Sequence, residues 1–359
     1  MSVFISVLTT LLVLGVIIFV HEIGHFSAAR LFKMKVCEFN MGMGPALFKK
    51  RGKETVYSLR IFPIGGSCVL GEDENPGDDP REFRNRPVWQ RMIVIVAGAA
   101  LNLVLGFVFC VIIACSINMP STTVGRFYDG AVSNTGSSAL QEGDKIHSIN
   151  GMRIFSYTDM SYKLGSSPSK GGNEVLAVFE FVVIRDGEKI TLPEVSFAAE
   201  PNERGGMAYR HDFAVYRIPK NFINVMSYSF HSAVSQGRII WLSIMDLIKG
   251  TYGLNELSGP VGVAAVIDEV TSRAETLRDR MFYIISLSAL ISINLGIVNL
   301  LPIPALDGAR LIFFAVEAVR RKPLKAEVEG TIHFVGFALL MLLMLAVTFN
   351  DIRRLVFGG

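Results

Sequence analysis

Long uninterrupted apolar runs dominate the hydrophobic pattern of this chain. The first run, Val3–Val20, contains no charged residue, and comparable runs occupy Met92–Ile117, Phe282–Leu301 and Ile332–Phe349. A helix needs about 20 predominantly apolar residues to cross the hydrocarbon core of a bilayer. The pattern therefore predicts four transmembrane helices.

The pattern changes between the second and third runs. From Pro120 to about Phe197, short alternating runs are separated by turn signals such as Asn150-Gly151, which predicts a β-rich domain. Phe222–Lys249 is amphipathic, and indicates either a helix lying on the membrane surface or one packed on the core that the apolar runs form. A turn at Gly253–Gly262 and a charged helix at Thr271–Arg280 then lead to the third run.

Basic residues are distributed unevenly around the apolar runs. They are concentrated between the first and second runs and between the third and fourth. The positive-inside rule places both connections in the cytoplasm, which puts the N-terminus and the β-rich domain outside. The basic residues concerned are Arg30, Lys33, Lys35, Lys49, Lys50, Arg51, Lys53, Arg60, Arg81, Arg84, Arg86, Arg91, Arg310, Arg320, Arg321, Lys322 and Lys325.

Composition narrows the function classes. Half of the 359 residues are hydrophobic, which is too many for an ordinary soluble protein, and the net charge of +3 says little about partners. The four cysteines form neither a CxxC pair nor a disulfide framework. The sequence contains no glycine-rich nucleotide-binding loop and no basic patch typical of nucleic-acid binding.

The first apolar run ends in a cluster of ionisable residues, His21-Glu22-Ile23-Gly24-His25. Residues four apart share a helix face, so His21 and His25 can direct two imidazoles at one ion, with the Glu22 carboxylate beside them to activate water. The alternative is a harmless polar cluster on a solvated helix end. Ionisable groups at membrane depth are costly and usually functional, which favours a zinc site.

The third apolar run ends in an irregular segment, Pro302–Gly308. Backbone that leaves the helix at membrane depth is tolerated where protein buries it or where it lines a water-filled cavity. Asp307 in this segment is the natural third metal ligand. The alternative is that Asp307 caps a helix running from Gly308 to Arg320.

Two further features each leave two interpretations open. Strands at Thr55–Arg60 and Ser67–Leu70 form either a surface hairpin or an edge onto which an extended peptide could pair near the active site. Asn102 follows small residues in the second apolar run, and it forms either a simple interhelical hydrogen bond or part of the site.

With the HExxH cluster in the first run and the segment Asn299–Gly308 after the third, the chain resembles the site-2 protease family of intramembrane zinc metalloproteases. Within that family it resembles the bacterial regulator-of-sigma-E group, with a single PDZ domain: Ala139–Ile146 followed by Ile149–Gly151 resembles a bacterial PDZ signature. The resemblance implies that His21, His25 and Asp307 are zinc ligands and that Glu22 is the catalytic acid and base. It also implies that Asn299 binds substrate, and that Pro63, Gly65 and Gly66 belong to a membrane-associated β-hairpin that binds substrate. Asn102 would be the asparagine of a Gly-Pro-x-x-Asn element, in which Ala99 replaces the proline here.

The expected fold is a polytopic α-helical membrane protein with four transmembrane helices, a membrane-associated β-hairpin and an inserted periplasmic β-rich PDZ domain. The expected segments are a first transmembrane helix (1–32), a cytoplasm-facing connection with the hairpin (33–90), a second transmembrane helix (91–118), the PDZ domain (119–198), a periplasmic amphipathic helical segment (199–280), a third transmembrane helix (281–301), the Leu-Asp-Gly motif with a cytoplasmic connection (302–330), a fourth transmembrane helix (331–350) and a C-terminal tail (351–359).

The resemblance implies a zinc-dependent endopeptidase of the bacterial inner membrane, with its active site toward the cytoplasmic side. Its expected substrates are single-span membrane proteins, such as anti-sigma factors or signal-peptide remnants already trimmed by an upstream site-1-type protease. The expected partners are therefore these substrates, that protease and the lipid bilayer, with no nucleic acid. The alternatives are a PDZ-bearing membrane scaffold or chaperone that does not cut, and a metal transporter.

Overall fold

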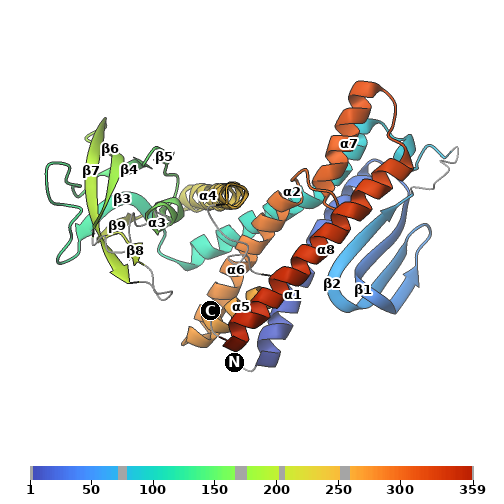
Figure 1. Ribbon diagram of the computed structural model, residues 1–359, viewed down its shortest axis with the longest axis horizontal. Coiled ribbons are helices and arrows are strands. Elements are labelled where there is room, and N and C mark those ends of the chain that lie inside the picture. Colours follow the sequence, from blue (N-terminus) through green and yellow to red (C-terminus); the bar gives the residue numbers. More distant parts are fainter. Residues whose placement is uncertain (1–2, 72–78, 166–175, 202–206, 251–258, 358–359) are drawn as a thin grey trace. The chain divides into compact units, whose positions relative to one another are not determined.

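A computed structural model describes residues 3–71, 79–165, 176–201, 207–250 and 259–357. The chain forms two compact units: Met1–Phe109 with Ser243–Gly359, and Cys110–Leu242. Their helices and strands are shown in Figure 1. Two long helices, α2 (Val88–Ser116) and α4 (Phe222–Ile248), cross the boundaries between the units.

The first unit is built on long apolar helices. Among the described residues, four helical segments are long and apolar enough to cross a membrane: Ile5–Leu31, Val88–Ser116, Leu277–Val298 and Glu327–Arg353. They belong to α1 (Val3–Leu31), α2, α6 (Leu277–Val298) and α8 (Ala326–Phe357). The prediction of a polytopic helical membrane protein is therefore confirmed.

The connections between these helices include a 3-10 turn (Phe83–Asn85), α5 (Pro260–Arg273) and α7 (Asp307–Arg320). The expected turn at Gly253–Gly262 lies partly outside the described residues, and helix α5 begins within its last part. The charged helix expected at Thr271–Arg280 does not form as one element. Instead α5 ends at Arg273, and Thr276 and Asp279 form a capping box that starts α6.

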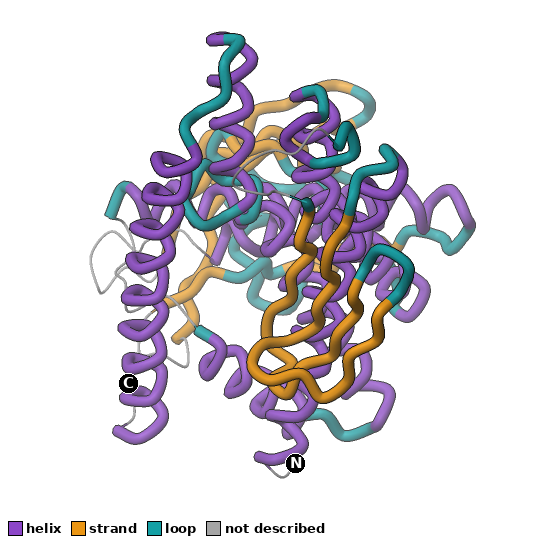
Figure 2. The backbone as a smooth tube through the Cα atoms, turned by 90° about the vertical axis from the view of Figure 1, so that its right-hand side faces the viewer, coloured by secondary structure: helices purple, strands orange, loops and turns teal. Residues whose placement is uncertain are grey.

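A bent β-hairpin packs beside α1. Strands β1 (Val36–Arg51) and β2 (Val56–Leu70) are longer than the sequence predicted, and both fold back on themselves (Figure 2). Residue Asn40 of β1 pairs with Ser58 from the first half of β2 and with Ser67 from its second half. The second half of β2 therefore pairs with β1 on one side only, which makes it an edge of the hairpin sheet.

A hydrophobic cluster joins the hairpin to the helices. Side chains from α1, both strands, α2 and α7 meet there and are almost completely buried, which fixes the hairpin against the ends of three helices. Its fully buried members are Ala29, Met34, Val36, Leu70, Phe83, Val94, Ile95 and Phe314.

The second unit contains an antiparallel sheet with its own core. Its strands are β3 (Pro120–Phe127), β4 (Lys145–Ile149), β5 (Met152–Arg153), β6 (Leu176–Arg185), β7 (Glu188–Pro201), β8 (Met207–Tyr209) and β9 (Phe213–Arg217). The order is β8-β7-β6-β4-β3-β9, with β5 paired to β4. The sheet thus extends past residue 198 into the segment expected to be helical, because β9 pairs with β3.

Helix α3 (Tyr157–Gly165) and the first part of α4 complete the second unit. A buried carboxylate, Asp159, joins the two helices. It accepts a hydrogen bond from the Ser235 hydroxyl at 2.8 Å and forms an ion pair with Arg238 at 2.6 Å. Because Asp159 is completely buried, these polar contacts link α4 to α3 inside the second unit.

Candidate metal centre and active site

Three ligand atoms meet in the first unit, two from α1 and one from the start of α7. The Nε2 atoms of His21 and His25 are 3.1 Å apart, and they lie 3.2 and 3.3 Å from Oδ2 of Asp307. Both histidines are 8% exposed. Asp307 is more than 280 positions from either histidine in the sequence, and the fold brings all three side chains together.

This geometry fits a tetrahedral zinc ion. Zinc bonds to imidazole nitrogen and carboxylate oxygen at about 2.0–2.2 Å, so two ligands of a tetrahedral ion lie about 3.3 Å apart. The three observed separations match that value. Elsewhere among the described residues, no other group of three histidine, cysteine or acidic side chains gathers in this way.

The ring orientation of His25 is fixed from α2. Its Nδ1 lies 2.8 Å from the carbonyl oxygen of Val94, and a carbonyl can only accept a hydrogen bond. Nδ1 therefore carries the proton, and Nε2 keeps the lone pair that a metal needs. A backbone partner of this kind is the usual support of a metal-binding histidine.

Asn102 plays the corresponding part for His21. Its side-chain amide lies 3.4 Å from Nδ1 of His21, and its Oδ1 is buried without a hydrogen-bond partner. The two ends of an amide are exchanged by half a turn, and that rotation pairs Oδ1 with an Nδ1–H donor on His21. The free lone pair of His21 then lies on Nε2, toward the other two ligand atoms.

The irregular segment between α6 and α7 positions Asp307 at the start of α7. The N-cap residue of α7 is Leu306, which makes no side-chain cap, and Asp307 belongs to the first turn. The capping alternative is therefore not what the structure shows, because the carboxylate points at the two imidazoles. The N–H of Gly308 donates to the carbonyl of Asn299 at 2.7 Å and closes the segment.

Helix α8 supports the same segment from the other side. A Cβ on Gly336 would lie 2.1 Å from Cβ of Pro304, so the helix backbone and the proline are in direct contact. Nδ1 of His333 accepts a hydrogen bond from the N–H of Ala305 at 3.3 Å. Ala305 has a φ of 79°, a strained conformation for a residue with a side chain, and these contacts help to hold it.

Glu22 lies between the metal ligands and the edge of the hairpin. The backbone N–H of Cys68 donates a hydrogen bond to its carboxylate. A Cβ on Gly66 would lie only 2.7 Å from Cγ of Glu22, so the glycine leaves room for that side chain. Beside them is a cavity of about 30 Å³, large enough for a water molecule, which Gly65 also lines.

The remaining predicted residues lie near this centre to differing degrees. Nδ2 of Asn299 is 3.5 Å from Nε2 of His21, so its amide faces the ligand atoms. Pro63 lies in β2, and its side chain is outside the described part of the chain. The structure thus brings Asn299, Asn102 and Gly66 to the same site as the three ligands and Glu22.

Sequence reasoning missed Gly98 on α2. A Cβ at this position would lie 2.3 Å from Nε2 of His25 and 2.9 Å from Cε1 of His21. The absence of a side chain is therefore what leaves space for both imidazoles. The run of small residues before Asn102 did signal close packing, but it did not show that the imidazoles are what packs there.

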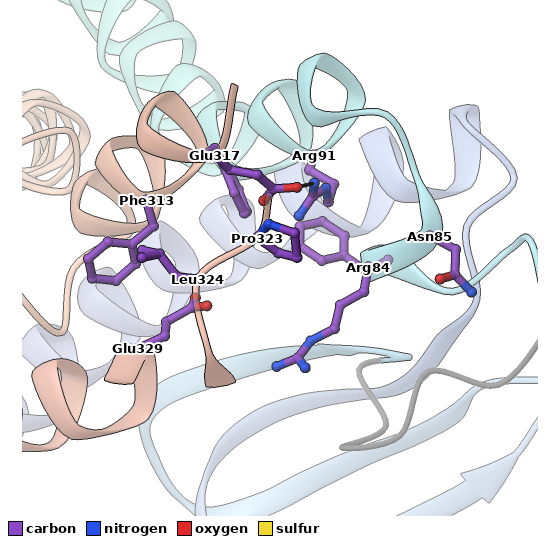
Figure 3. A pocket seen from close by; sticks show the side chains of 10 residues that line it. Arg84, Asn85, Arg91, Phe313, Glu317, Pro323, Leu324 and Glu329 are labelled. Carbon is purple, nitrogen blue, oxygen red and sulfur yellow. Dashed lines mark hydrogen bonds and ion pairs between the residues drawn. The ribbon is translucent and has the colours of Figure 1, made fainter. Parts of the chain in front are cut away.

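A polar cavity of about 390 Å³ borders Asp307, and Arg310, His333 and Arg84 also line it. A neighbouring cavity of about 320 Å³ shares Arg84 with it and is shown in Figure 3, where Glu317 and Arg91 form an ion pair. Of these two cavities, the first is the one that reaches a residue of the candidate centre.

Comparison with known proteins identifies the family of this chain. A family model described as peptidase family M50 matches residues 9–343. This chain belongs to peptidase family M50. The match covers both histidines, Glu22 and Asp307, so the whole site lies inside the M50 region.

Two similar proteins are named as proteases. The chain is 30% identical over 433 aligned positions to the regulator of sigma-W protease RasP of Bacillus subtilis, covering 98% of this chain and 99% of that protein. It is 29% identical over 434 positions to the zinc metalloprotease RasP of Bacillus licheniformis, with 98% and 99% covered. The M50 chain described here is therefore a zinc metalloendopeptidase of the site-2 protease type.

Proposed function

We propose that this M50 protease cuts the membrane-spanning segments of single-span proteins, and that His21, His25 and Asp307 hold its zinc ion. The observation that carries the proposal is the convergence of these three side chains inside a bundle of apolar helices. When bound, zinc lowers the pKa of water and polarises the scissile carbonyl.

Glu22 is the proton carrier of the reaction. Its carboxylate accepts a proton from the attacking water and passes that proton to the nitrogen of the leaving amine. The Cys68 N–H donates a hydrogen bond that orients the carboxylate. The polar cavity lined by Asp307 would admit water to that side of the centre.

The edge of the hairpin is the proposed substrate-binding strand. A helical substrate hides its amides in its own hydrogen bonds, so it must unwind before it can be cut. The second half of β2 has one unpaired side, and it passes Glu22 at Gly66 and Cys68. A substrate added to that edge would extend past the metal centre, with Asn299 donating to its backbone.

Exposed apolar side chains on the hairpin support its contact with lipid. On a soluble surface such a group would be unusual, whereas on a membrane-associated hairpin it is expected. The exposed side chains are Met43, Leu47, Phe48, Tyr57, Leu59, Ile61, Phe62 and Val69.

The sheet of the second unit is proposed to be a single PDZ domain on the outer side of the bacterial inner membrane. Its support is the Ala139–Gly151 signature, which spans the turn into β4 and the β4–β5 connection. The basic connections support the proposed topology, in which the N-terminus lies outside and the active site faces the cytoplasm. The domain would restrict access to substrates already shortened by an upstream site-1-type protease.

Anti-sigma factors and remnant signal peptides are the proposed substrate classes. One relative is named regulator of sigma-W protease, which supports the first class. Purified protein should contain zinc and should cut single-span peptides carrying such segments in micelles, and a chelator should stop the cutting.

Substitution of Glu22 separates this function from its rivals. Glu22→Gln should keep the zinc content and lower the cleavage rate by about a hundredfold to ten-thousandfold. A scaffold would bind substrates without cutting in the wild type as well. A transporter would carry zinc across liposomes and leave peptides whole. Undiminished cleavage by Glu22→Gln would refute the assigned role.

A further inference from the structure

A large basic cavity lies in the second unit, outside the metal centre. Its volume is about 660 Å³, and it lies between the sheet and the first turns of α4. Residues from β3, β4, β5, β6 and β7 form one side, and α4 contributes Asn224, Ser227, Tyr228 and His231.

The cavity is lined by cations and contains no carboxylate among its lining residues. Lys145, Arg153 and Lys189 are exposed, and none of them forms a salt bridge with any residue that the structure describes. His147 lies among them: its burial, together with the charges of Lys189, Arg153 and Lys145, lowers its pKa. The site therefore has a positive potential and favours an anionic ligand.

The cavity lies close to the end of an apolar span. Helix α2 ends at Ser116, and the cavity lining begins at Pro120. The ammonium of Lys220 donates a hydrogen bond to the carbonyl of Cys115 at 2.8 Å, which ties the chain just before α4 to the end of α2. The start of α4 and the cavity wall are thus held next to the end of an apolar helix.

The first part of α4 exposes a narrow apolar stripe. At about 100° per residue, Ile223, Phe230, Val234 and Trp241 lie within roughly 20° of one line along the helix. All four are between 41% and 76% exposed. The cavity-lining residues of α4 lie about a quarter of a turn away, and the buried Ser229 and Ser232 lie on the opposite side.

This arrangement matches a helix lying in the membrane surface. The stripe would enter the boundary between headgroups and acyl chains, as amphipathic interfacial helices do, with Trp241 suited to that depth. The flank of such a helix then lies at headgroup level, and that flank forms the wall of the basic cavity.

We propose that the cavity binds the headgroup of an anionic phospholipid, with the phosphate between Lys145, Arg153 and Lys189. The bound lipid would anchor the sheet domain and α4 to the membrane surface. The ion pair of Asp159 with Arg238 joins α4 to α3, the helix that follows β5 of the cavity wall in the chain.

The test uses the full-length protein in micelles of a neutral maltoside detergent. Binding of short-chain phosphatidylglycerol is measured by titration calorimetry, with short-chain phosphatidylcholine, inorganic phosphate and a peptide with a free C-terminal carboxylate as competitors. Each basic residue near an anionic headgroup contributes about fivefold in affinity, so removing two should weaken binding about thirtyfold.

The variant is R153Q with K189Q, and R126Q is the matched control because Arg126 is exposed on β3 and outside the cavity lining. We expect saturable phosphatidylglycerol binding that is weakened in the double variant and about fivefold in K145Q alone, with R126Q unchanged. Equal binding by the double variant would overturn the proposal. Displacement by inorganic phosphate or by the peptide at similar concentration would also overturn it, because the site would then take free phosphate or a peptide terminus.

Discussion

Gly98 offers the sharpest test of the metal centre, because a single methyl group there would occupy the space of the imidazoles. In Gly98→Ala the added Cβ would lie 2.3 Å from Nε2 of His25 and 2.6 Å from its Cε1. Ordinary carbon contacts begin at about 3.4 Å. The His25 ring must therefore move by roughly 1 Å, and its Nε2 is the atom that would bind zinc.

A displacement of that size is large for a metal site. Zinc–ligand distances are held to within about 0.2 Å, and loss of a supporting partner alone weakens metal binding about 10- to 100-fold. Moving a ligand itself should have at least the upper effect. We therefore expect Gly98→Ala to weaken zinc binding by about a hundredfold or more and to abolish cleavage.

The assay is zinc content by plasma mass spectrometry after dialysis against a zinc buffer, together with cleavage of a single-span peptide. Gly165→Ala on α3 is the matched control, because a Cβ there meets nothing within 4 Å and α3 belongs to the second unit. Both changes replace a helical glycine by alanine, so a non-specific effect of the substitution should appear in both variants.

Wild-type zinc affinity and cleavage in Gly98→Ala would refute the placement of the two imidazoles against α2. Loss of zinc in both variants would show that the effect does not come from the imidazole contact. Partial recovery of cleavage at millimolar zinc in Gly98→Ala alone would support the reasoning, since a weakened site can still be filled.

Three further changes probe the surroundings of the site. Asn102→Ala should weaken zinc binding about 10- to 100-fold, because it removes the partner of His21 Nδ1; competition with a fluorescent chelator measures this, and unchanged affinity would contradict it. Gly66→Ala should lower kcat while leaving the zinc content intact, since the added methyl would press on Glu22. Steady-state cleavage measures kcat and a zinc assay measures the content, and a change in KM alone would contradict this expectation. Burial lowers the pKa of His211, so the unfolded chain binds the proton more readily. Resistance to thermal unfolding should therefore decrease below pH 6.5, and His211→Gln should weaken that dependence, with His147 contributing the remainder.

Much of the metal centre could be predicted because its residues are local in sequence or chemically unusual. His21 and His25 are four residues apart on one helix, and a charged cluster at the end of an apolar run has few harmless explanations. Asp307 stood out for a similar reason, since it follows two prolines at the end of a span. What the sequence could not show is that the two elements meet, because that depends on how α1 and α6 pack.

The residues that support the ligands were harder to predict, because they act either through the absence of a side chain or through a backbone group. Gly98 contributes empty space, Val94 contributes a carbonyl oxygen, and Cys68 contributes an N–H. None of these leaves a distinctive side-chain pattern.

The hairpin was underestimated for a related reason. Its first strand includes Gly42, Gly44 and Pro45, which weaken any alternating pattern, and the bends that make both strands fold back lie where the register shifts. In the second unit, β8 and β9 are three and five residues long, too short to stand out from a connection.

The contact of Gly336 and His333 with the Pro302–Asp307 segment has a consequence for biosynthesis. A ribosome delivers the two histidines early, but the carboxylate and the helix that steadies it arrive only when almost all of the chain has been made. A polypeptide truncated before Asp307 would therefore carry two of the three side chains of the candidate centre. We expect such a polypeptide not to cut neighbouring membrane proteins, so that proteolysis would begin only after α7 and α8 have been made and inserted.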